Sequence, residues 1–180
     1  MKFQSITVSQ SATQTLITLE EARAQLRVFD GLDDDKINIC MESAVSYCEG
    51  VIWRSFREQT IIASYSVDGR PFAELMRAEF GELLGVSYYD ADNILQKIDI
   101  SNVIIDSALF VPRAYFKEPT TSQSIFAPIK IEYKTCPTNI LPEVKQAALI
   151  ATAQFFDDRN NPDLSAVDKI LYPIATRHFL

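Results

Sequence analysis

Residues 142–161 read PEVKQAALIATAQFFDDRNN, and this stretch decides the class of fold. Its apolar residues recur three or four positions apart, which places one set along a single face of a helix: Val144, Ala148, Ala151 and Phe155. Other apolar residues widen that face, so we expect a helix that is buried on most sides. Pro142 suits the first helical turn, where its missing N–H costs nothing. The sequence therefore predicts a central helix with other helices packed around it.

Three further segments have helical periodicity. The first begins at Thr18, which has the spacing of a capping box with Glu21. The second begins in the acidic cluster 33–35, where an aspartate is expected to cap it, and ends at about Trp53. The last begins near Ser165. With the central segment they predict about four helices.

The stretch between the second and the central helix has the composition of strands instead. Residues 60–67 and 84–89 are rich in β-branched or aromatic residues and are followed by turn residues. Shorter strands are expected in four other segments: 94–98, 103–105, 108–111 and 129–133. These strands predict a small antiparallel β insertion at residues 58–136. Residues 1–15 are polar and indicate a flexible or extended arm.

The expected fold is therefore an α+β fold in a single domain of residues 1–180. Its mainly helical core comes from residues 16–57 and 139–180, and the small antiparallel β insertion lies between the second and third helices. A chain of 180 residues is long enough to bury a sizeable core.

Composition excludes several classes of function. The net charge is −7 and the basic residues form no run, which argues against tight binding of nucleic acid. The sequence has no stretch of about 18 apolar residues that would predict a membrane span, and its first residues lack the pattern of a signal peptide. We expect Cys40, Cys48 and Cys136 to be reduced and buried, and to pack as small hydrophobic residues.

No residue pattern predicts catalysis or a bound cofactor. The single histidine, His178, lies close to the last residue and is poorly placed for a nucleophilic triad. The five glycines form no phosphate-binding loop, and no cysteine or histidine cluster offers metal ligands. The acidic residues 33–35 lack the ligand pattern of a calcium loop. We therefore predict no catalytic, cofactor-binding or metal-binding residues.

Several segments in a fixed order carry a resemblance that spans nearly the whole chain. They are residues 17–27 (ITLEEARAQLR), the acidic turn 33–35, the helix with Ala44 and Glu49, Arg54-Ser55-Phe56 with Gln59-Thr60, residues 86–92 (VSYYDAD), residues 141–147 (LPEVKQA), residues 155–159 (FFDDR) and Leu171-Tyr172-Pro173. Together they resemble the head-tail connector, or adaptor, family of tailed bacteriophages and of related prophage and gene-transfer particles. Asn93 stands where the family's hairpin usually has glycine.

The resemblance implies a structural virion protein without catalysis or cofactor. It implies a ring, typically of twelve copies, that lies below the portal vertex in the virion neck and is assembled in the host cytoplasm. The implied partners are other copies of the chain, the portal protein and a stopper or tail-completion protein, with no membrane. DNA would pass through the ring without sequence-specific binding, and a negatively charged subunit suits this because it repels phosphates.

Three regions are candidate contact elements of such a ring. Trp53 and Phe56 are either a partner-facing aromatic anchor or ordinary core residues. The polar loop 117–124 and the tail 175–180 are expected to order on assembly. The candidate interface residues are Trp53, Phe56, Arg57, Lys117, Glu118, Arg177, Phe179 and Leu180.

Two alternatives stay open. A neck stopper or tail-completion protein would share the location but not the ring position. A small enzyme or ligand-binding regulatory domain would instead have a deep pocket with convergent polar groups in the β insertion.

Overall fold

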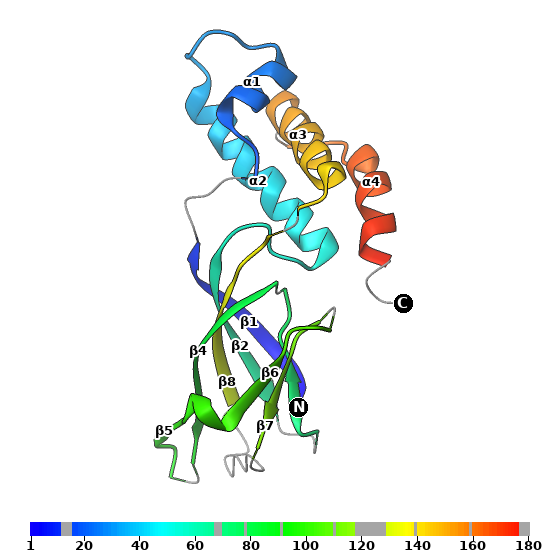
Figure 1. Ribbon diagram of the computed structural model, residues 1–180. Helices are drawn as coiled ribbons and strands as arrows, with labels where there is room; N and C mark the ends of the chain where they lie inside the picture. The colour runs from blue at the N-terminus through cyan, green and yellow to red at the C-terminus, as the bar shows by residue number, and fades with distance from the viewer. Residues whose placement is uncertain are drawn as a thin grey trace. The chain divides into compact units, whose positions relative to one another are not determined.

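The structure of the chain is a computed structural model, which describes residues 1–11, 16–66, 70–77, 79–90, 92–109, 111–117, 129–138, 140–158 and 160–176. The chain divides into two compact units, and each unit is built from two separate stretches (Figure 1). The β unit contains Met1–Thr13 and Arg57–Thr138, and the helical unit contains Gln14–Phe56 and Asn139–Leu180. The expectation of a single domain stays a prediction.

The helical unit has four helices among its described residues: α1 (Leu19–Leu26), α2 (Asp34–Ile52), α3 (Pro142–Asp157) and α4 (Ser165–Thr176). The capping box expected at the start of α1 is present. The backbone N–H of Glu21 donates to Thr18 Oγ1 at 3.2 Å, and the Thr18 N–H donates to Glu21 Oε2 at 2.9 Å. Each bond satisfies a backbone donor that has no partner within the helix, so the sequence fixes where α1 begins.

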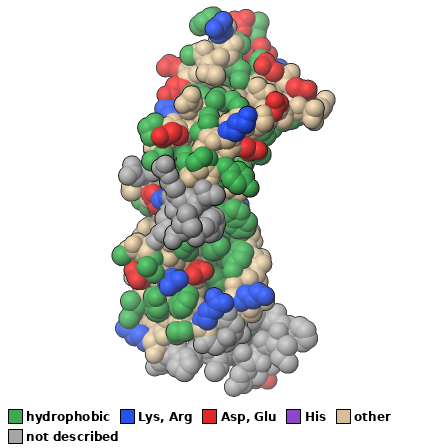
Figure 2. All heavy atoms as spheres, turned by 90° about the vertical axis from the view of Figure 1, so that its right-hand side faces the viewer, with side chains coloured by type: hydrophobic (Ala, Val, Ile, Leu, Met, Phe, Trp, Pro, Cys, Tyr) green, Lys and Arg blue, Asp and Glu red, His purple; other side chains and the backbone are tan. Residues whose placement is uncertain are grey.

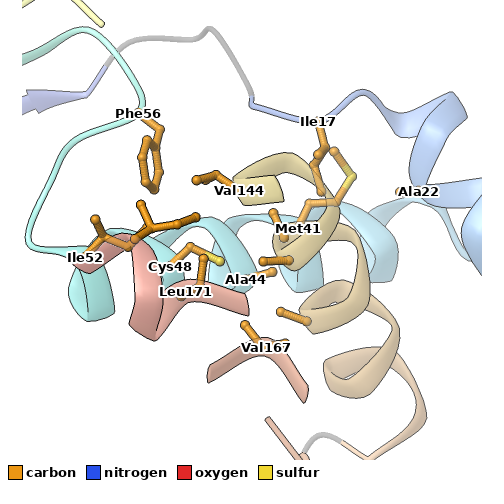
Figure 3. Packing of buried hydrophobic residues seen from close by; sticks show 14 of the residues in the cluster. Ile17, Ala22, Met41, Ala44, Cys48, Ile52, Phe56, Val144, Val167 and Leu171 are labelled. Carbon is orange, nitrogen blue, oxygen red and sulfur yellow. The ribbon is translucent and has the colours of Figure 1, made fainter. Parts of the chain in front are cut away.

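The core of the helical unit lies where α2, α3 and α4 meet, as Figure 3 shows. Small side chains are fully buried on α2 and α3: Ala44, Ala147, Ala148 and Ala151. Small side chains at a contact allow two helix backbones to lie close together, and Met41 and Leu171 belong to the same buried cluster. α3 is thus the helix that its sequence predicts, with Val144, Ala148 and Ala151 buried; Phe155, the fourth residue of the predicted face, is only partly buried.

The β unit has two antiparallel sheets among its described residues. The five-stranded sheet has the order β1-β2-β8-β4-β5, and the three-stranded sheet has the order β3-β7-β6. Their strands are β1 (Lys2–Ser11), β2 (Gln59–Ser66), β3 (Phe72–Glu74), β4 (Phe80–Tyr89), β5 (Leu95–Ile98), β6 (Val103–Asp106), β7 (Arg113–Phe116) and β8 (Ile129–Thr135). A short 3-10 helix, η1 (Ile100–Asn102), joins β5 to β6.

The core of the β unit contains residues from both sheets. Alternate residues of β8 are buried, which is the two-residue period of a strand with one face turned inward. Tyr65 and Tyr133 are the largest fully buried side chains, and both phenols donate hydrogen bonds to carbonyl groups in the segment that begins with β3. Tyr65 Oη lies 2.5 Å from the Glu74 oxygen, and Tyr133 Oη lies 2.5 Å from the Met76 oxygen. Buried phenols that are bonded in this way tie the two sheets together.

The expected fold class is wrong. The described residues are about 38% helix, η1 included, and 33% strand; they form two antiparallel sheets beside the helices and not a mainly helical core with a small β insertion. Residues 2–11 of the expected flexible or extended arm form the strand β1, and residues 12–15 lie outside the described residues. β1 pairs with β2 along its whole length, and two register shifts interrupt the alternation that would have revealed a strand. The expected strand at residues 108–111 is not formed by its described residues, and β7 begins at Arg113.

Candidate functional site

The turn between α1 and α2 is held by a two-point ion pair. Arg23 Nε donates to Asp34 Oδ1 at 2.8 Å, and Arg23 Nη2 bonds to the other carboxylate oxygen. Arg27 closes α1 in the left-handed conformation, with its N–H donating to the Ala24 oxygen. Asp33 lies at the cap position of α2 but makes no side-chain cap hydrogen bond, so the acidic cluster braces the turn through Asp34 instead of capping the helix as expected.

This braced turn presents two large apolar side chains to solvent. Phe29 is 85% exposed and Leu32 is 89% exposed, the highest values among the exposed large hydrophobic residues of the described chain. Folding is not stabilised by side chains in such positions, because they stay in contact with water. An exposed apolar pair on a preorganised turn is typical of a surface that is covered by another protein.

The end of α2 carries the aromatic pair singled out in the sequence, and the structure separates its two members. Phe56 is buried in the helical core, and its N–H donates to Glu49 Oε1 at 2.9 Å. Trp53 is 48% exposed and closes α2 with a left-handed backbone (φ 58°). Phe56 is therefore a core residue, and Trp53 alone of the pair is available as an aromatic anchor.

Of the remaining interface candidates, two lie among the described residues. Lys117 is exposed at the end of β7, and its ammonium group donates to the Ser101 oxygen at 2.7 Å. Arg57 begins the β unit, and its carbonyl oxygen accepts from Thr135 Oγ1 at 2.9 Å. Four candidates and the single histidine lie outside the described residues: Glu118, Arg177, His178, Phe179 and Leu180. The role of all of them as interface residues stays a prediction.

The outer face of the three-stranded sheet carries an apolar row in exact cross-strand register. Tyr115 of β7 pairs with Ile104 of β6 on one side and with Phe72 of β3 on the other. The rings of Phe72 and Tyr115 lie 5.6 Å apart, and Ile104 is 54% exposed. Arg113 lies over the Phe72 ring at 4.5 Å and forms an ion pair with Glu74 at 3.1 Å. This face is a second apolar surface, on the β unit.

The turn between β4 and β5 is organised by Asp90. Its carboxylate accepts from the N–H groups of Asp92 and Ile94 and from the Gln96 side chain, and these hydrogen bonds, that of Gln96 first, lower the pKa of Asp90. Asn93, at the position where the resemblance expects glycine, has a left-handed backbone with φ 58°. Asparagine tolerates this conformation better than most residues, so the turn keeps its geometry without glycine.

The titratable groups with shifted pKa values serve the fold. Burial raises the pKa of the Cys48 thiol to about 12, which keeps it protonated and unreactive. Burial, with a hydrogen bond of 2.6 Å to Asp168, raises the pKa of Tyr47 to about 12. A hydrogen bond from Lys145 lowers the pKa of Glu21. The same Glu21 carboxylate accepts the hydrogen bond from Thr18 in the capping box. Cys40 is buried as expected, but Cys136 is exposed.

In the described part of the chain, no group of three or more His, Cys, Asp or Glu residues could hold a metal ion. No helix in the same residues is both long and apolar enough to cross a membrane.

Charge is distributed unequally between the two units. The helical unit has thirteen acidic and eight basic residues, and the β unit has eleven acidic and nine basic residues. On the face turned to the viewer in Figure 2, acidic side chains are frequent over the helical unit, and Lys and Arg side chains gather over the lower part of the β unit. The excess of negative charge is therefore carried mainly by the helices.

Comparisons with known proteins give matches in structure alone. No protein-family profile matches the sequence, and no curated protein matches it. Solved structures do match, each over 94% of this chain and 94% of the other. One is described as the virion of the native gene transfer agent (GTA) particle, with a TM-score of 0.75 and 12% identity. Two others come from the neck of the empty particle, computed with C6 symmetry (0.70, 15%), and of the native particle, computed with C12 symmetry (0.70, 14%). The chain shares their fold.

Phe29 and Leu32 were missed in the sequence, although a signal was present. Two large apolar residues stand beside Gly31 in an acidic turn between helices, where polar residues are the rule. The row of Phe72, Tyr115 and Ile104 had no such signal, because β3 and β7 were not recognised as strands and their pairing is not local in the sequence.

Proposed function

We propose that this chain is a structural subunit of a particle neck, a head-tail connector or adaptor that joins a DNA-filled head to a tail. The observation that carries the proposal is the fold, which it shares over 94% of its length with chains from gene transfer agent particles. The segments that resemble the connector family lie on elements of that common fold, from the capping box of α1 to the start of α3. Two independent kinds of likeness thus agree on one role and on a location in the virion neck.

The subunit acts as a member of a ring that surrounds the path of the DNA. Supporting this, neck structures of the same fold were computed with C6 and C12 symmetry, and both symmetries place identical subunits around one axis. The ring has twelve copies and contacts the portal protein on one side and a stopper or tail-completion protein on the other. The net negative charge suits a channel from which DNA must be released, because like charges repel.

The surfaces of the subunit suit protein–protein contact better than chemistry. Large apolar side chains are exposed on both units, and the groups with shifted pKa values are engaged in caps, turns and cores. The subunit would therefore act without catalysis and without a cofactor. The loop that contains Lys117 and Glu118 and the tail with Arg177, Phe179 and Leu180 are proposed as contact elements, the tail on the portal side.

Deletion of the gene that encodes this chain tests the proposed function. We expect DNA-filled heads and complete tails that do not join, seen by negative-stain electron microscopy, and joining restored when the gene is supplied in trans. Normal yields of joined particles would contradict the proposal. Removal of residues 177–180 alone, which leaves α4 complete, is expected to block joining while the purified chain keeps its helical circular dichroism.

A neck stopper is the nearest alternative, and the same particles distinguish it. Focused reconstruction of the neck locates the chain: a ring in direct contact with the portal supports the adaptor, and a ring one position further towards the tail supports the stopper.

A further inference from the structure

The two ends of the helical unit have different chemistry. At one end, the turn with Phe29 and Leu32 leads into α2, and Lys36 of the first turn of α2 lies over the Phe156 ring at 3.7 Å. This contact brings the last turn of α3 beside the α1–α2 turn, as Figure 1 also shows. We call this the acidic end: it consists of the described residues 27–36 and 156–158.

The acidic end is negatively charged after its internal pairs are set aside. Arg23 and Asp34 neutralise one another. The other acidic side chains of this end are Asp30, Asp33, Asp35, Asp157 and Asp158, against the basic Arg27 and Lys36. A surface that covers Phe29 and Leu32 must therefore be apolar at its centre and must tolerate or attract negative charge at its rim.

The opposite end of the unit has exposed aromatic side chains. Trp53 closes α2, and Leu171 of α4 packs beside Cys48 and Ile52 in the last turns of α2 (Figure 3). Tyr172, the residue after Leu171, is 66% exposed. We call Trp53 and Tyr172 the aromatic end. Arg54, which follows Trp53, is partly buried; with the buried Glu49 of the same turn and the exposed Glu143 in the first turn of α3 beside it, this end carries no net positive charge.

The two ends differ in charge and cannot meet within one copy. α2 has 19 residues, so its ends lie about 28 Å apart. One end offers an aliphatic and aromatic pair in a negative field, and the other offers two exposed aromatic side chains with less negative charge around them. Aromatic residues are enriched in the centres of protein interfaces. Different patches on one chain that fit each other produce head-to-tail contacts, and such contacts build rings.

We propose that copies of this chain join head to tail through the helical unit, with Phe29 and Leu32 of one copy packed against Trp53 and Tyr172 of the next. The proposal deepens the ring function argued above and rests on it. The braced turn contributes by holding both apolar side chains outward before contact, so little conformational entropy is lost when they are covered. The charges contribute by orienting the approach and by disfavouring contact between two acidic ends.

Two variants and their mixture test the contact on the purified full chain. The first variant carries Phe29→Ser and Leu32→Ser, and the second carries Trp53→Asn and Tyr172→Ser. Phe29, Leu32 and Tyr172 are largely exposed, Trp53 is 48% exposed, and asparagine accepts the left-handed backbone of residue 53. Circular dichroism should therefore stay close to that of the natural chain, and thermal unfolding of each variant is measured beside it. The matched control is Ile94→Ser, which removes an exposed apolar side chain (58%) from the β unit.

Sedimentation velocity over a concentration series supplies the readout. The natural chain and the control should form oligomers that grow with concentration, and each variant alone should associate at least about tenfold more weakly. A mixture of the two variants keeps one intact acidic end and one intact aromatic end, so it should form one-to-one pairs and nothing larger.

Two results would overturn the inference: oligomers of either variant as strong as those of the natural chain, or a natural chain that stays monomeric up to its solubility limit. If either occurs while gene deletion still separates heads from tails, the neck function stands and this contact alone is wrong.

Discussion

The helical unit and the β unit bury different residues at their main contacts. Both cores contain alanines and isoleucines, but where α2 meets α3 the helical unit buries Ala44, Ala147, Ala148 and Ala151. Between its sheets the β unit buries two whole tyrosines, Tyr65 and Tyr133, with isoleucines. We expect little room for added atoms at the alanine contact, and a cavity where a large side chain of the β unit is shortened. The helical unit should therefore be sensitive to added volume and the β unit to removed volume.

The largest effect is expected from removal of volume in the β unit. Ile131→Ala takes three carbon atoms from a fully buried position on β8, the strand between β2 and β4. We expect a loss of about 3 kcal/mol in the free energy of unfolding, measured by urea denaturation, because the cavity adds to the lost burial. Ile104→Ala, on the exposed face of β6, is the control and should cost less than about 0.5 kcal/mol. Equal effects at the two positions would contradict the comparison.

Added volume in the helical unit should come next. Ala148→Leu forces three carbon atoms into the contact of α3 with α2 and should lower the free energy of unfolding by about 2 kcal/mol. Hydrogen exchange read by mass spectrometry should show the loss of protection in α2 and α3 first. Ala166→Leu makes the same change at an exposed position of α4 and should have almost no effect. If Ala148→Leu were equally well tolerated, the close packing inferred for these helices would be wrong.

Removal of a single oxygen atom sharpens the comparison in the β unit. Tyr133→Phe leaves the Met76 carbonyl group without its phenol donor and should cost about 1–2 kcal/mol at pH 8. Tyr88→Phe, at a partly buried position of β4, is the control.

The Tyr133 effect should depend on pH in a defined direction. Burial raises the pKa of Tyr133 well above its usual value, so the unfolded chain ionises first when the pH rises above about 10. The natural chain then loses stability, and the Tyr133→Phe chain does not, because it lacks the phenol. The difference in stability between the two chains should therefore shrink between about pH 9 and about pH 11, one unit either side of the unfolded pKa, in thermal melts. A difference that grows with pH would show that the buried phenol is not the cause.

The smallest effect is expected at the start of α1. Thr18→Ala removes one half of the capping box and should cost about 1 kcal/mol, with protection lost in α1 and retained in the β unit. Ser46→Ala, at an exposed position in the middle of α2, should be neutral or slightly stabilising because alanine has the better helix propensity. A Thr18→Ala chain as stable as the natural one would mean that the cap contributes nothing beyond local geometry.

The helices could be predicted because their signals are local. Thr18 and Glu21 are three residues apart and bind each other, and the period of α3 is visible within one segment. The strands depend on partners far away in the sequence. β1 is polar, is interrupted by two register shifts and pairs with β2 across 48 residues (Ser11 with Gln59) to 64 residues (Lys2 with Ser66), so nothing in residues 2–11 alone reveals a strand. The share of β structure was underestimated for this reason.

The candidate site shows the same limit. The sequence leaves open whether Trp53 and Phe56 are surface or core residues, because the burial of Phe56 depends on Glu49 and on the core of three helices. The role of Trp53 as an anchor stays a prediction. Phe29 and Leu32 stand in an acidic turn near Gly31, and that position is the one sign of their exposure in the sequence. The Arg23–Asp34 pair that holds the turn joins residues of two helices and is visible only in the structure.

Neither unit is a continuous piece of the polypeptide, and this has a consequence during synthesis on the ribosome. β1 emerges first and must wait for β2, while α1 and α2 emerge early and must wait for α3 until the entire β unit has been translated. The sheets of the β unit can be completed as soon as β8 leaves the exit tunnel. The hydrophobic face of α2 stays exposed until α3 has been translated and packs on it. Nascent chains of this protein should therefore recruit chaperones to α2, and the finished subunit becomes competent to meet its neighbours only after its last helix has docked.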